Sequence, residues 1–446
     1  MGIFISFLTI FIMLIFSVFK EINILYPLIL GLVILSLLAF KRGFDMKSIL
    51  FMVLKGASKT NQLYILLILL GVSTATWMAC GTVPAFIYYG IKFINPQFFI
   101  ISTFLITCVV SLVIGSSFGT VGTIGIVFMI MAKASHINLD LTAGAIITAA
   151  YIGERSSPLS SSANLVAVLT ETNLYANLKR MFVTTIIPFL LVISIYLVLS
   201  VKNPLHVDFL NTSTELKTFY NLNFAVLIPA IVIILFVVFK MDVRIALGVS
   251  IIIAFGESIL FQSRSVGELI HFMIFGYNID PTSSLSDILH GGGVLSMVKS
   301  ILVVMISSCY AGIFESTNLL VEFESIVEKI SIRFGSFFAT TLTSVVGCFF
   351  GCSQTFAIIT SHQFMRKIYG DKNTDKSDLA LDIGNTAIVI APLIPWNIAA
   401  TFPAVILSVS TGYIPYAFFL YLVPLFCLIR AIICRYAEQQ SISKGY

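Results

Sequence analysis

Residues 182–201 read F-V-T-T-I-I-P-F-L-L-V-I-S-I-Y-L-V-L-S-V and contain no charged side chain. Such a run lies within the roughly 17–25 apolar residues that cross the hydrocarbon of a bilayer. Lipid offers no partner to backbone N–H and C=O groups, so the run must be helical. Residues 63–80 and 225–239 are further apolar runs. The sequence therefore predicts an all-α fold, a polytopic membrane bundle of about eleven to thirteen segments.

The composition of the whole chain supports this class. Of the 446 residues, 58% are hydrophobic and 11% are charged, and the mean hydropathy is +1.02. A soluble protein of this size would carry about 25% charged residues. The net charge of +5 comes from basic residues in short connections, as in membrane proteins, and we expect contact with the lipid bilayer and no nucleic acid. The seven cysteines follow neither a disulfide framework nor a metal-binding pattern, and no cofactor is expected.

The charge pattern near the N-terminus predicts an orientation. Residues 41–59 contain five basic side chains and one acidic side chain, Asp45. The positive-inside bias places this stretch and the N-terminus in the cytoplasm, in a multi-pass protein of the cell (inner or plasma) membrane. The apolar run at residues 3–19 lacks a basic leader and a cleavage signal, so we interpret it as the first transmembrane helix.

Two halves of the chain share a pattern. The run G-S-S-F-G-T-V-G-T from Gly115 aligns with G-C-F-F-G-C-S-Q-T from Gly347, and S-P-L from Ser157 aligns with A-P-L from Ala391 in the same order. These matches predict an internal duplication. The polar connection at residues 202–221 would separate a first transmembrane repeat, residues 1–201, from a second, residues 222–446.

Glycine, proline and hydroxyl residues interrupt the apolar pattern at residues 115–125, 153–164, 347–355 and 392–397. Interrupted helices at corresponding places in two repeats are typical of secondary transporters, whose binding sites lie where the broken helices meet. The sequence therefore predicts two halves with broken helices around one site near the middle of the membrane.

Glu154 and Arg155 are the strongest candidates for this site, because charged residues inside membrane segments are costly and usually face a cavity. A carboxylate at position 154 could bind a sodium ion and a proton in turn. The alternative is a structural Glu–Arg pair, or a pair that snorkels near a helix end.

Neutral oxygen atoms would complete an ion or substrate site. The candidate residues that carry them are Ser157, Ser160, Ser161, Asn164, Thr120, Thr123, Ser353, Thr355, Asn385 and Asn397. Small hydroxyl residues also serve close helix packing, which is the alternative for any single one of them. No sequence motif indicates a catalytic site, so an enzyme is not expected.

At these segments the sequence resembles the NhaC family of sodium/proton antiporters. The matching runs are G-S-S-F-G-T-V-G-T-I-G from Gly115, A-G-A-I-I-T-A-A-Y-I-G-E-R-S-S-P-L-S from Ala143, A-P-L-I-P-W-N from Ala391 and Y-I-P-Y-A-F-F from Tyr413. The resemblance covers both halves and implies a cation-coupled antiporter with inverted repeats. Composition and spacing leave the orientation of the repeats open.

The chain departs from the family pattern at acidic positions. It has Gly-Glu-Arg at residues 153–155 where the family has Gly-Asp-Lys, Ser161 where the family has an aspartate, and Gly-Asn at residues 384–385 where the family has an acidic pair. Fewer carboxylates offset the desolvation of a bare cation less well. Such a site would suit a solute that carries its own negative charge, held by Arg155.

Three functional hypotheses follow. The first is a sodium/proton antiporter in which Glu154 is alternately protonated and bound to sodium. The second is a carrier or exchanger of small organic acids or amino acids, coupled to sodium or protons, with Arg155 holding the substrate carboxylate. The third is a passive channel or a membrane subunit that does not transport. The sequence leaves a homo-oligomer open.

Overall fold

The computed structural model describes residues 2–20, 22–93, 95–135, 137–204, 216–239, 241–279, 289–317, 324–371 and 376–444. In these ranges every regular element is a helix, and the only β-type contact is an isolated bridge between Tyr277 and Gly291. The prediction of an all-α fold is confirmed.

The helices before residue 205 are α1 (Gly2–Phe19), α2 (Leu25–Lys41), α3 (Met46–Ser58), α4 (Asn61–Cys80), α5 (Thr82–Phe93), η1 (Pro96–Phe98), α6 (Phe99–Ile114), α7 (Ser117–Thr120), η2 (Val121–Gly125), α8 (Ile126–Ala134), α9 (Leu139–Ser156), α10 (Ser161–Leu169) and α11 (Leu174–Lys202). Those after residue 215 are η3 (Phe224–Leu227), α13 (Ile228–Val238), α14 (Val243–Gln262), α15 (Val266–Phe275), α16 (Val294–Thr317), α17 (Glu324–Phe334), α18 (Ser336–Gly351), α19 (Gln354–Asp371), α20 (Lys376–Ile390), η5 (Ala391–Leu393), α21 (Ile398–Ile406), η6 (Thr411–Tyr416) and α22 (Phe418–Lys444).

Several of these helices can cross a membrane. Among the described residues, six spans are long and apolar enough: Asn61–Cys80, Pro96–Ile114, Ser117–Ala134, Leu174–Lys202, Val243–Gln262 and Val294–Thr317. A seventh would be the pair Lys376–Leu393 and Ile398–Ile406, which is bent by 52° at its break. Six shorter apolar helices of 10–17 residues accompany them. The polytopic membrane class is therefore confirmed.

The predicted interruptions of the apolar pattern are breaks between helices. Gly115 lies between α6 and α7 with φ of 71°, and Cys352 lies between α18 and α19 with φ of 49°. Residues 157–160 separate α9 from α10, and residues 394–397 separate η5 from α21. Breaks thus occur at all the places that the aligned motifs indicate: between α6 and α7 and between α9 and α10, and again between α18 and α19 and between η5 and α21. The internal duplication and its boundaries stay predictions, and residues 205–215 of the predicted connection lie outside the described residues.

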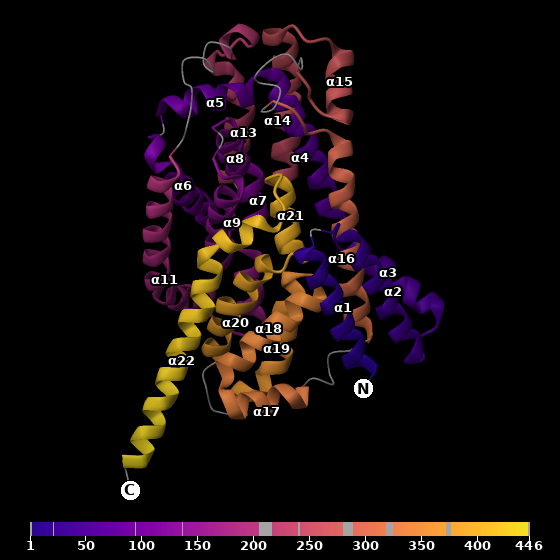
Figure 1. The fold of residues 1–446 in the computed structure, drawn as a ribbon, viewed down its shortest axis with the longest axis vertical. Helices are drawn as coiled ribbons and strands as arrows, with labels where there is room; N and C mark the ends of the chain where they lie inside the picture. The colour runs from indigo at the N-terminus through magenta and orange to yellow at the C-terminus, as the bar shows by residue number, and fades with distance from the viewer. Residues whose placement is uncertain are drawn as a thin grey trace.

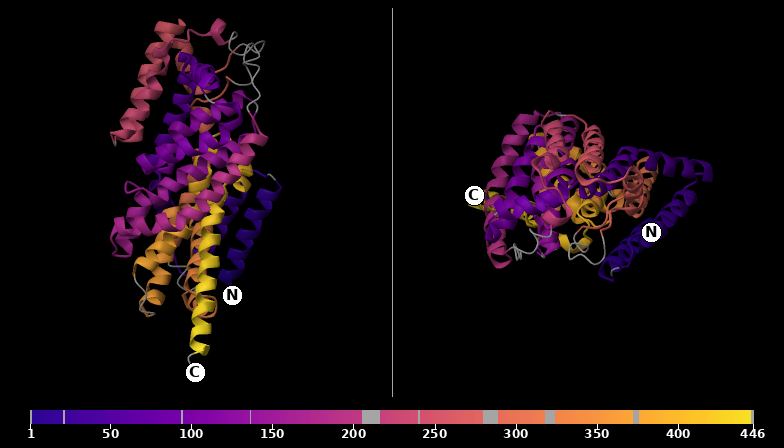
Figure 2. Two further views of the ribbon diagram at one scale, coloured as in Figure 1. Left: turned by 90° about the vertical axis from the view of Figure 1, so that its left-hand side faces the viewer. Right: turned by 90° about the horizontal axis from the view of Figure 1, so that it is seen from above.

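The buried side chains form two apolar cores. The α14 core joins α4, α5, α13, α14 and α15, which lie together in the upper part of Figure 1. The α9 core joins α1–α3, α6, α9 and α17–α20, with α22 against it. Helices α8, α16 and α21 contribute to both cores. Figure 2 shows α22 in yellow extending beyond the other helices toward the C-terminus, which lies at the same end of the molecule as the N-terminus.

The break at Gly115 requires glycine for two reasons. Its positive φ is one that side chains rarely adopt, and a Cβ added there would lie 2.7 Å from the carbonyl carbon of Leu159. We expect Gly115→Ala to lower the free energy of unfolding by about 1–3 kcal/mol. The measurement is the midpoint of thermal denaturation of the purified protein in detergent. Gly248→Ala is the control, because no atom lies within 4 Å of a Cβ added at this helical position. Equal midpoints for both variants would contradict the prediction.

Candidate functional site

Glu154 lies in the last turn of α9, and its side chain is 6% exposed. Oε2 accepts hydrogen bonds from the backbone N–H of Ser117 at 2.8 Å and from the Ser117 hydroxyl at 3.1 Å. Oε1 accepts one from the Ser162 hydroxyl at 2.5 Å. Ser117 begins α7 and Ser162 lies in the first turn of α10. The carboxylate is thus held at the starts of two helices, where free N–H groups and the helix dipole favour negative charge.

Neighbouring serines build the turn that brings these helix starts together. Ser157 donates to the carbonyl of Leu112 at 2.7 Å, which ties the end of α9 to α6. Ser160 donates to the backbone carbonyl of Glu154 and also accepts from the N–H of Ala163 at 3.1 Å as the N-cap of α10. Both hydroxyls therefore shape the backbone around the site, and neither reaches the Glu154 carboxylate.

Close packing of α6 against α9 fixes the position of the carboxylate. A Cβ added at Gly153 would lie 2.1 Å from the hydroxyl oxygen of Ser111, so only glycine permits this approach. Ser111 donates to the carbonyl of Ala150 at 2.6 Å. Helix α9 is therefore anchored along the turn that carries Glu154.

Arg155 points away from Glu154, into the contact of α9 with α11 and α20, and is fully buried. Its acceptors are all neutral: Asn385 Oδ1 at 3.1 Å from Nε, the hydroxyls of Thr185 at 2.6 Å, Thr184 at 2.9 Å and Ser156 at 3.1 Å, and the carbonyl of Met181 at 3.2 Å. No ion pair joins Arg155 to Glu154 or to another acid among the described residues. The structure therefore does not contain the Glu–Arg pair that was the alternative interpretation.

Residues of the predicted second repeat bond to Arg155 and to Ser162, the serine that donates to Glu154. Gln354, the first residue of α19, donates through Nε2 to the Ser162 hydroxyl at 2.9 Å. Asn385 on α20 is fully buried, accepts from Arg155 and donates to the sulfur of Cys427 at 3.3 Å. The site therefore lies between the two predicted repeats.

The corresponding place in the second repeat carries no charge. Four residues before the aligned prolines, the first repeat has Glu154 and the second has Ile388; four residues after them stand Ser162 and Trp396. The indole N–H of Trp396 donates to the carbonyl of Phe349 at 2.9 Å, and their ring centroids are 4.8 Å apart. In this alignment an isoleucine stands in place of the carboxylate, and an aromatic contact stands in place of the Ser162 donor.

Several predicted site residues lie elsewhere. Ser161 and Asn164 are exposed, and the amide of Asn164 donates to the carbonyls of Pro158 at 3.1 Å and Ser160 at 2.7 Å. Thr355 is exposed, and Ser353 is half-buried, with its carbonyl accepting from Ala357.

Three further predicted residues are buried, and their side chains form hydrogen bonds with backbone carbonyls. The hydroxyls of Thr120 and Thr123 donate to carbonyls one turn earlier, those of Ser116 at 2.8 Å and Gly119 at 2.7 Å. Asn397 is the N-cap of α21, and its amide donates to the carbonyl of Cys348 at 2.8 Å. None of the three has a bond to Glu154 or Arg155.

Sequence reasoning missed Ser117, Gln354, Thr184 and Thr185. Ser117 and Gln354 lie inside the motifs singled out at Gly115 and Gly347. These motifs therefore predicted where the helices break, but other residues of the motifs were chosen as site candidates. Thr184 and Thr185 lie in the apolar run at residues 182–201, where two adjacent hydroxyls are a visible signal.

Comparison with known proteins gives a consistent answer. The Na+/H+ antiporter family matches residues 149–433, which include Glu154, Arg155, Gln354 and Asn385. Three relatives are each 28% identical to this chain. One is an uncharacterized Na(+)/H(+) antiporter of Haemophilus influenzae, whose alignment covers 87% of this chain and 86% of the relative. The second is a malate-2H(+)/Na(+)-lactate antiporter of Bacillus subtilis, with 90% of this chain and 87% of the relative aligned. The third is the Na(+)/H(+) antiporter NhaC of B. subtilis, with 96% of each chain aligned.

The resemblance to the NhaC family that the motifs indicated is thereby confirmed, and the chain is placed among membrane transporters. Since the family match extends over well more than half of the chain and across both candidate repeats, this protein belongs to the Na+/H+ antiporter family.

Proposed function

We propose that this protein exchanges sodium ions for protons across the cell membrane, and that the Glu154 carboxylate binds the two in turn. The observation that carries the proposal is the geometry of Glu154: a buried carboxylate at a helix break, held by hydroxyl and N–H donors and not neutralised by a fixed cation. A carboxylate that no cation contacts in such a place suits a small cation, because the cation removes the cost of burying the charge.

The serine hydroxyls allow both ligands. A hydroxyl carries one rotatable donor and two acceptor lone pairs. Ser117 and Ser162 donate to the ionised carboxylate, and after rotation the same oxygens could coordinate sodium, a hard cation that takes oxygen ligands. A protonated Glu154 could instead donate to Ser162. Sodium and the proton would compete for one negative charge, and this competition is the basis of exchange.

The position of the site between the repeats supports alternating access. Carriers built from repeats open toward one side of the membrane and then the other by moving one part against the other around a fixed site. The hydrogen bond from Gln354 to Ser162 spans the two predicted repeats beside Glu154. A relative movement of α10 and α19 would break this bond and change the environment of the carboxylate.

Replacing the carboxylate tests the proposal. In liposomes that contain a pH-sensitive dye, Glu154→Gln should abolish proton movement driven by a sodium gradient, because the amide binds neither a proton nor a cation. Glu328→Gln, at an exposed position on α17, should transport like the wild type. Folding of both variants is checked by size-exclusion chromatography. Wild-type rates in the Glu154→Gln variant would refute the role of Glu154.

A second candidate function is exchange of small organic acids. Full burial of Arg155 without a carboxylate partner favours it, and one relative is a malate-2H(+)/Na(+)-lactate antiporter. A guanidinium has five N–H donors, however, and Arg155 already makes bonds through each of its nitrogen atoms. A substrate carboxylate would have to displace these bonds, so sodium/proton antiport is the better-supported function.

The variant Asn385→Asp separates the two functions. It places a carboxylate where Arg155 already reaches, so the guanidinium becomes neutralised by an ion pair. We expect sodium-driven proton movement within about threefold of the wild type, since Glu154 is untouched; a threefold change in rate is about 0.65 kcal/mol. The assay is the same liposome measurement, with and without a panel of organic acids.

Asn385→Ala is the matched control, because it removes the acceptor without adding charge. Loss of transport in a folded Asn385→Asp protein, with retention in Asn385→Ala, would mean that the free charge of Arg155 is required and would favour organic-acid exchange.

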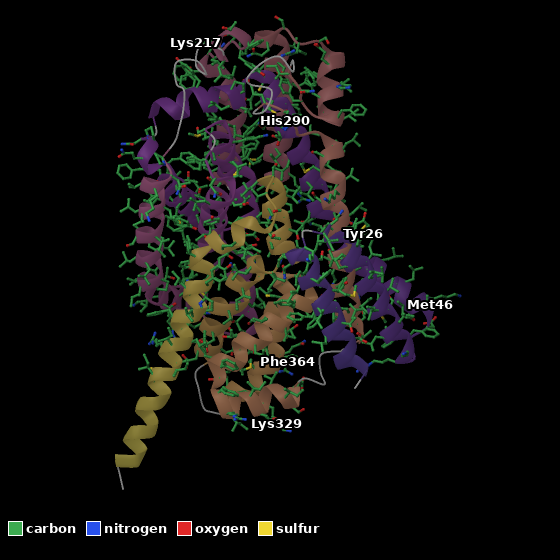
Figure 3. The ribbon with its side chains drawn as sticks, viewed as in Figure 1. Tyr26, Met46, Lys217, His290, Lys329 and Phe364 are labelled. Carbon is green, nitrogen blue, oxygen red and sulfur yellow. The ribbon has the colours of Figure 1, made fainter. Side chains whose placement is uncertain are left out.

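We further propose that the N-terminus lies in the cytoplasm. The basic stretch at residues 41–59 supports this orientation. Figure 3 places Met46, within that stretch, and Lys329 in the lower part of the molecule, and Lys217 and His290 at the opposite end. Both termini lie at the lower end in Figure 1.

The cysteines allow a test of this orientation. Cys434 is exposed near the C-terminal end, whereas the other six cysteines are buried. A membrane-impermeant maleimide should therefore label the protein in inside-out vesicles and leave it unlabelled in intact cells. Cys434→Ser should remove the labelling. Labelling of intact cells that depends on Cys434 would reverse the proposed orientation.

A further inference from the structure

Glu257 is a second buried acid, on a helix of the α14 core, whereas Glu154 lies on a helix of the α9 core. It lies on α14 in the apolar span Val243–Gln262 and is 6% exposed. Its Oε2 atom is buried and has no hydrogen-bond partner among the described residues. Both oxygens of Glu154, in contrast, accept hydrogen bonds. A buried carboxylate oxygen without a donor is costly, so Glu257 needs an explanation of its own.

Glu257 lies on a face of α14 that packs against α4. Two turns earlier on the same face of α14, Ser250 accepts a hydrogen bond from the indole N–H of Trp77 on α4 at 2.9 Å. At the ends of the same two helices, Nε2 of Gln262 on α14 donates to the carbonyl of Cys80 on α4 at 3.0 Å. Glu257 therefore lies at the contact of α4 with α14, inside the α14 core, whereas Glu154 is carried by the α9 core.

No cation neutralises Glu257 among the described residues. The helices packed against α14 are α4, α13 and α15. Their titratable groups are Tyr64 and Cys80 on α4 and Glu268 and His271 on α15, and α13 has none. At the ends of α14, Arg244 pairs with Asp242 and Arg264 donates to the hydroxyl of Tyr277 at 3.2 Å. The two titratable residues of α15, Glu268 and His271, are both exposed.

Sodium would find few ligands at this place. The hydroxyl of Ser250 donates to the carbonyl of Pro229 at 2.8 Å, and that of Ser258 donates to the carbonyl of Ala254 at 2.7 Å. The Cys80 thiol contacts the hydroxyl of Thr82 at 2.9 Å, and sulfur is a poor ligand for a hard cation. A proton, in contrast, neutralises a carboxylate without needing any further ligand.

We propose that Glu257 is a second proton-binding site of the carrier, located between α4 and α14 and separate from the Glu154 site. This deepens the proposed function, because a carrier with two protonatable acids can move a further proton in each cycle. The protonation itself does not depend on which solute the protein transports. Glu257 would release its proton when movement of the α14 core against the α9 core admits water to the contact of α4 with α14.

Infrared difference spectroscopy of the purified protein, recorded between mildly acidic and alkaline pH, tests the site directly. A protonated carboxylic acid in apolar surroundings gives a C=O stretching band distinct from that of a carboxylate. We expect a band that disappears as the pH rises, is absent in Glu257→Gln and remains in Glu154→Gln. Glu268→Gln, at the exposed position on α15, should retain it. If Glu257→Gln does not fold, Glu257→Asp is the test variant in its place. It should shift the band without removing it.

Two results would overturn the proposal: difference spectra that are the same in Glu257→Gln and the wild type, or a Glu257 band that is removed by sodium at constant pH. The transport arm measures the number of protons moved per sodium ion in liposomes at imposed voltage, which should fall by one in Glu257→Gln. If wild-type liposomes show no sodium-driven proton movement, the proposed function fails, while the infrared band still reports whether Glu257 binds a proton.

Discussion

A carboxylate inside a membrane protein must be hydrogen-bonded, paired with a cation or protonated, because neither lipid nor apolar side chains solvate it. Glu154 meets this requirement with donors from Ser117 and Ser162, and the nearby architecture serves to supply them. Two helices have to begin at the same place, which requires two breaks in the chain. The breaks are possible only because their freed backbone groups are bonded within the protein instead of facing lipid.

The two repeats use the same breaks for different purposes. In the first, the breaks present hydroxyl and N–H donors to a charge. In the second, Ile388 aligns with Glu154, Trp396 donates to the carbonyl of Phe349, and Asn397 ties the start of α21 to α18. Within the described ranges, the predicted second repeat makes side-chain hydrogen bonds to this site through Gln354 and Asn385.

Much of this arrangement could be predicted from the sequence. Apolar runs predict the helical membrane class, and glycine, proline and hydroxyl clusters predict where helices break. Glu154 is visible because a charge in an apolar run is rare. The choice among neighbouring hydroxyls was not predictable, since adjacent positions on a helix point about 100° apart. Ser162 therefore meets the carboxylate, whereas Ser161 is exposed. The bonds of Arg155 to Thr184 and Thr185 depend on how α9 packs against α11, which no local pattern specifies.

The buried charge of Arg155 has an electrical consequence. Guanidinium stays protonated in proteins, so the adjacent pair of Glu154 and Arg155 is neutral in sum when the site is empty and carries one positive charge when a sodium ion or a proton is bound. A membrane potential acts on a charge that crosses the field, with about 2.3 kcal/mol per elementary charge per 100 mV. An interior-negative potential would therefore favour the loaded site facing the cytoplasm and leave the empty site unaffected. A permanently charged residue beside the proposed binding carboxylate could in this way set which half of the transport cycle the membrane voltage drives.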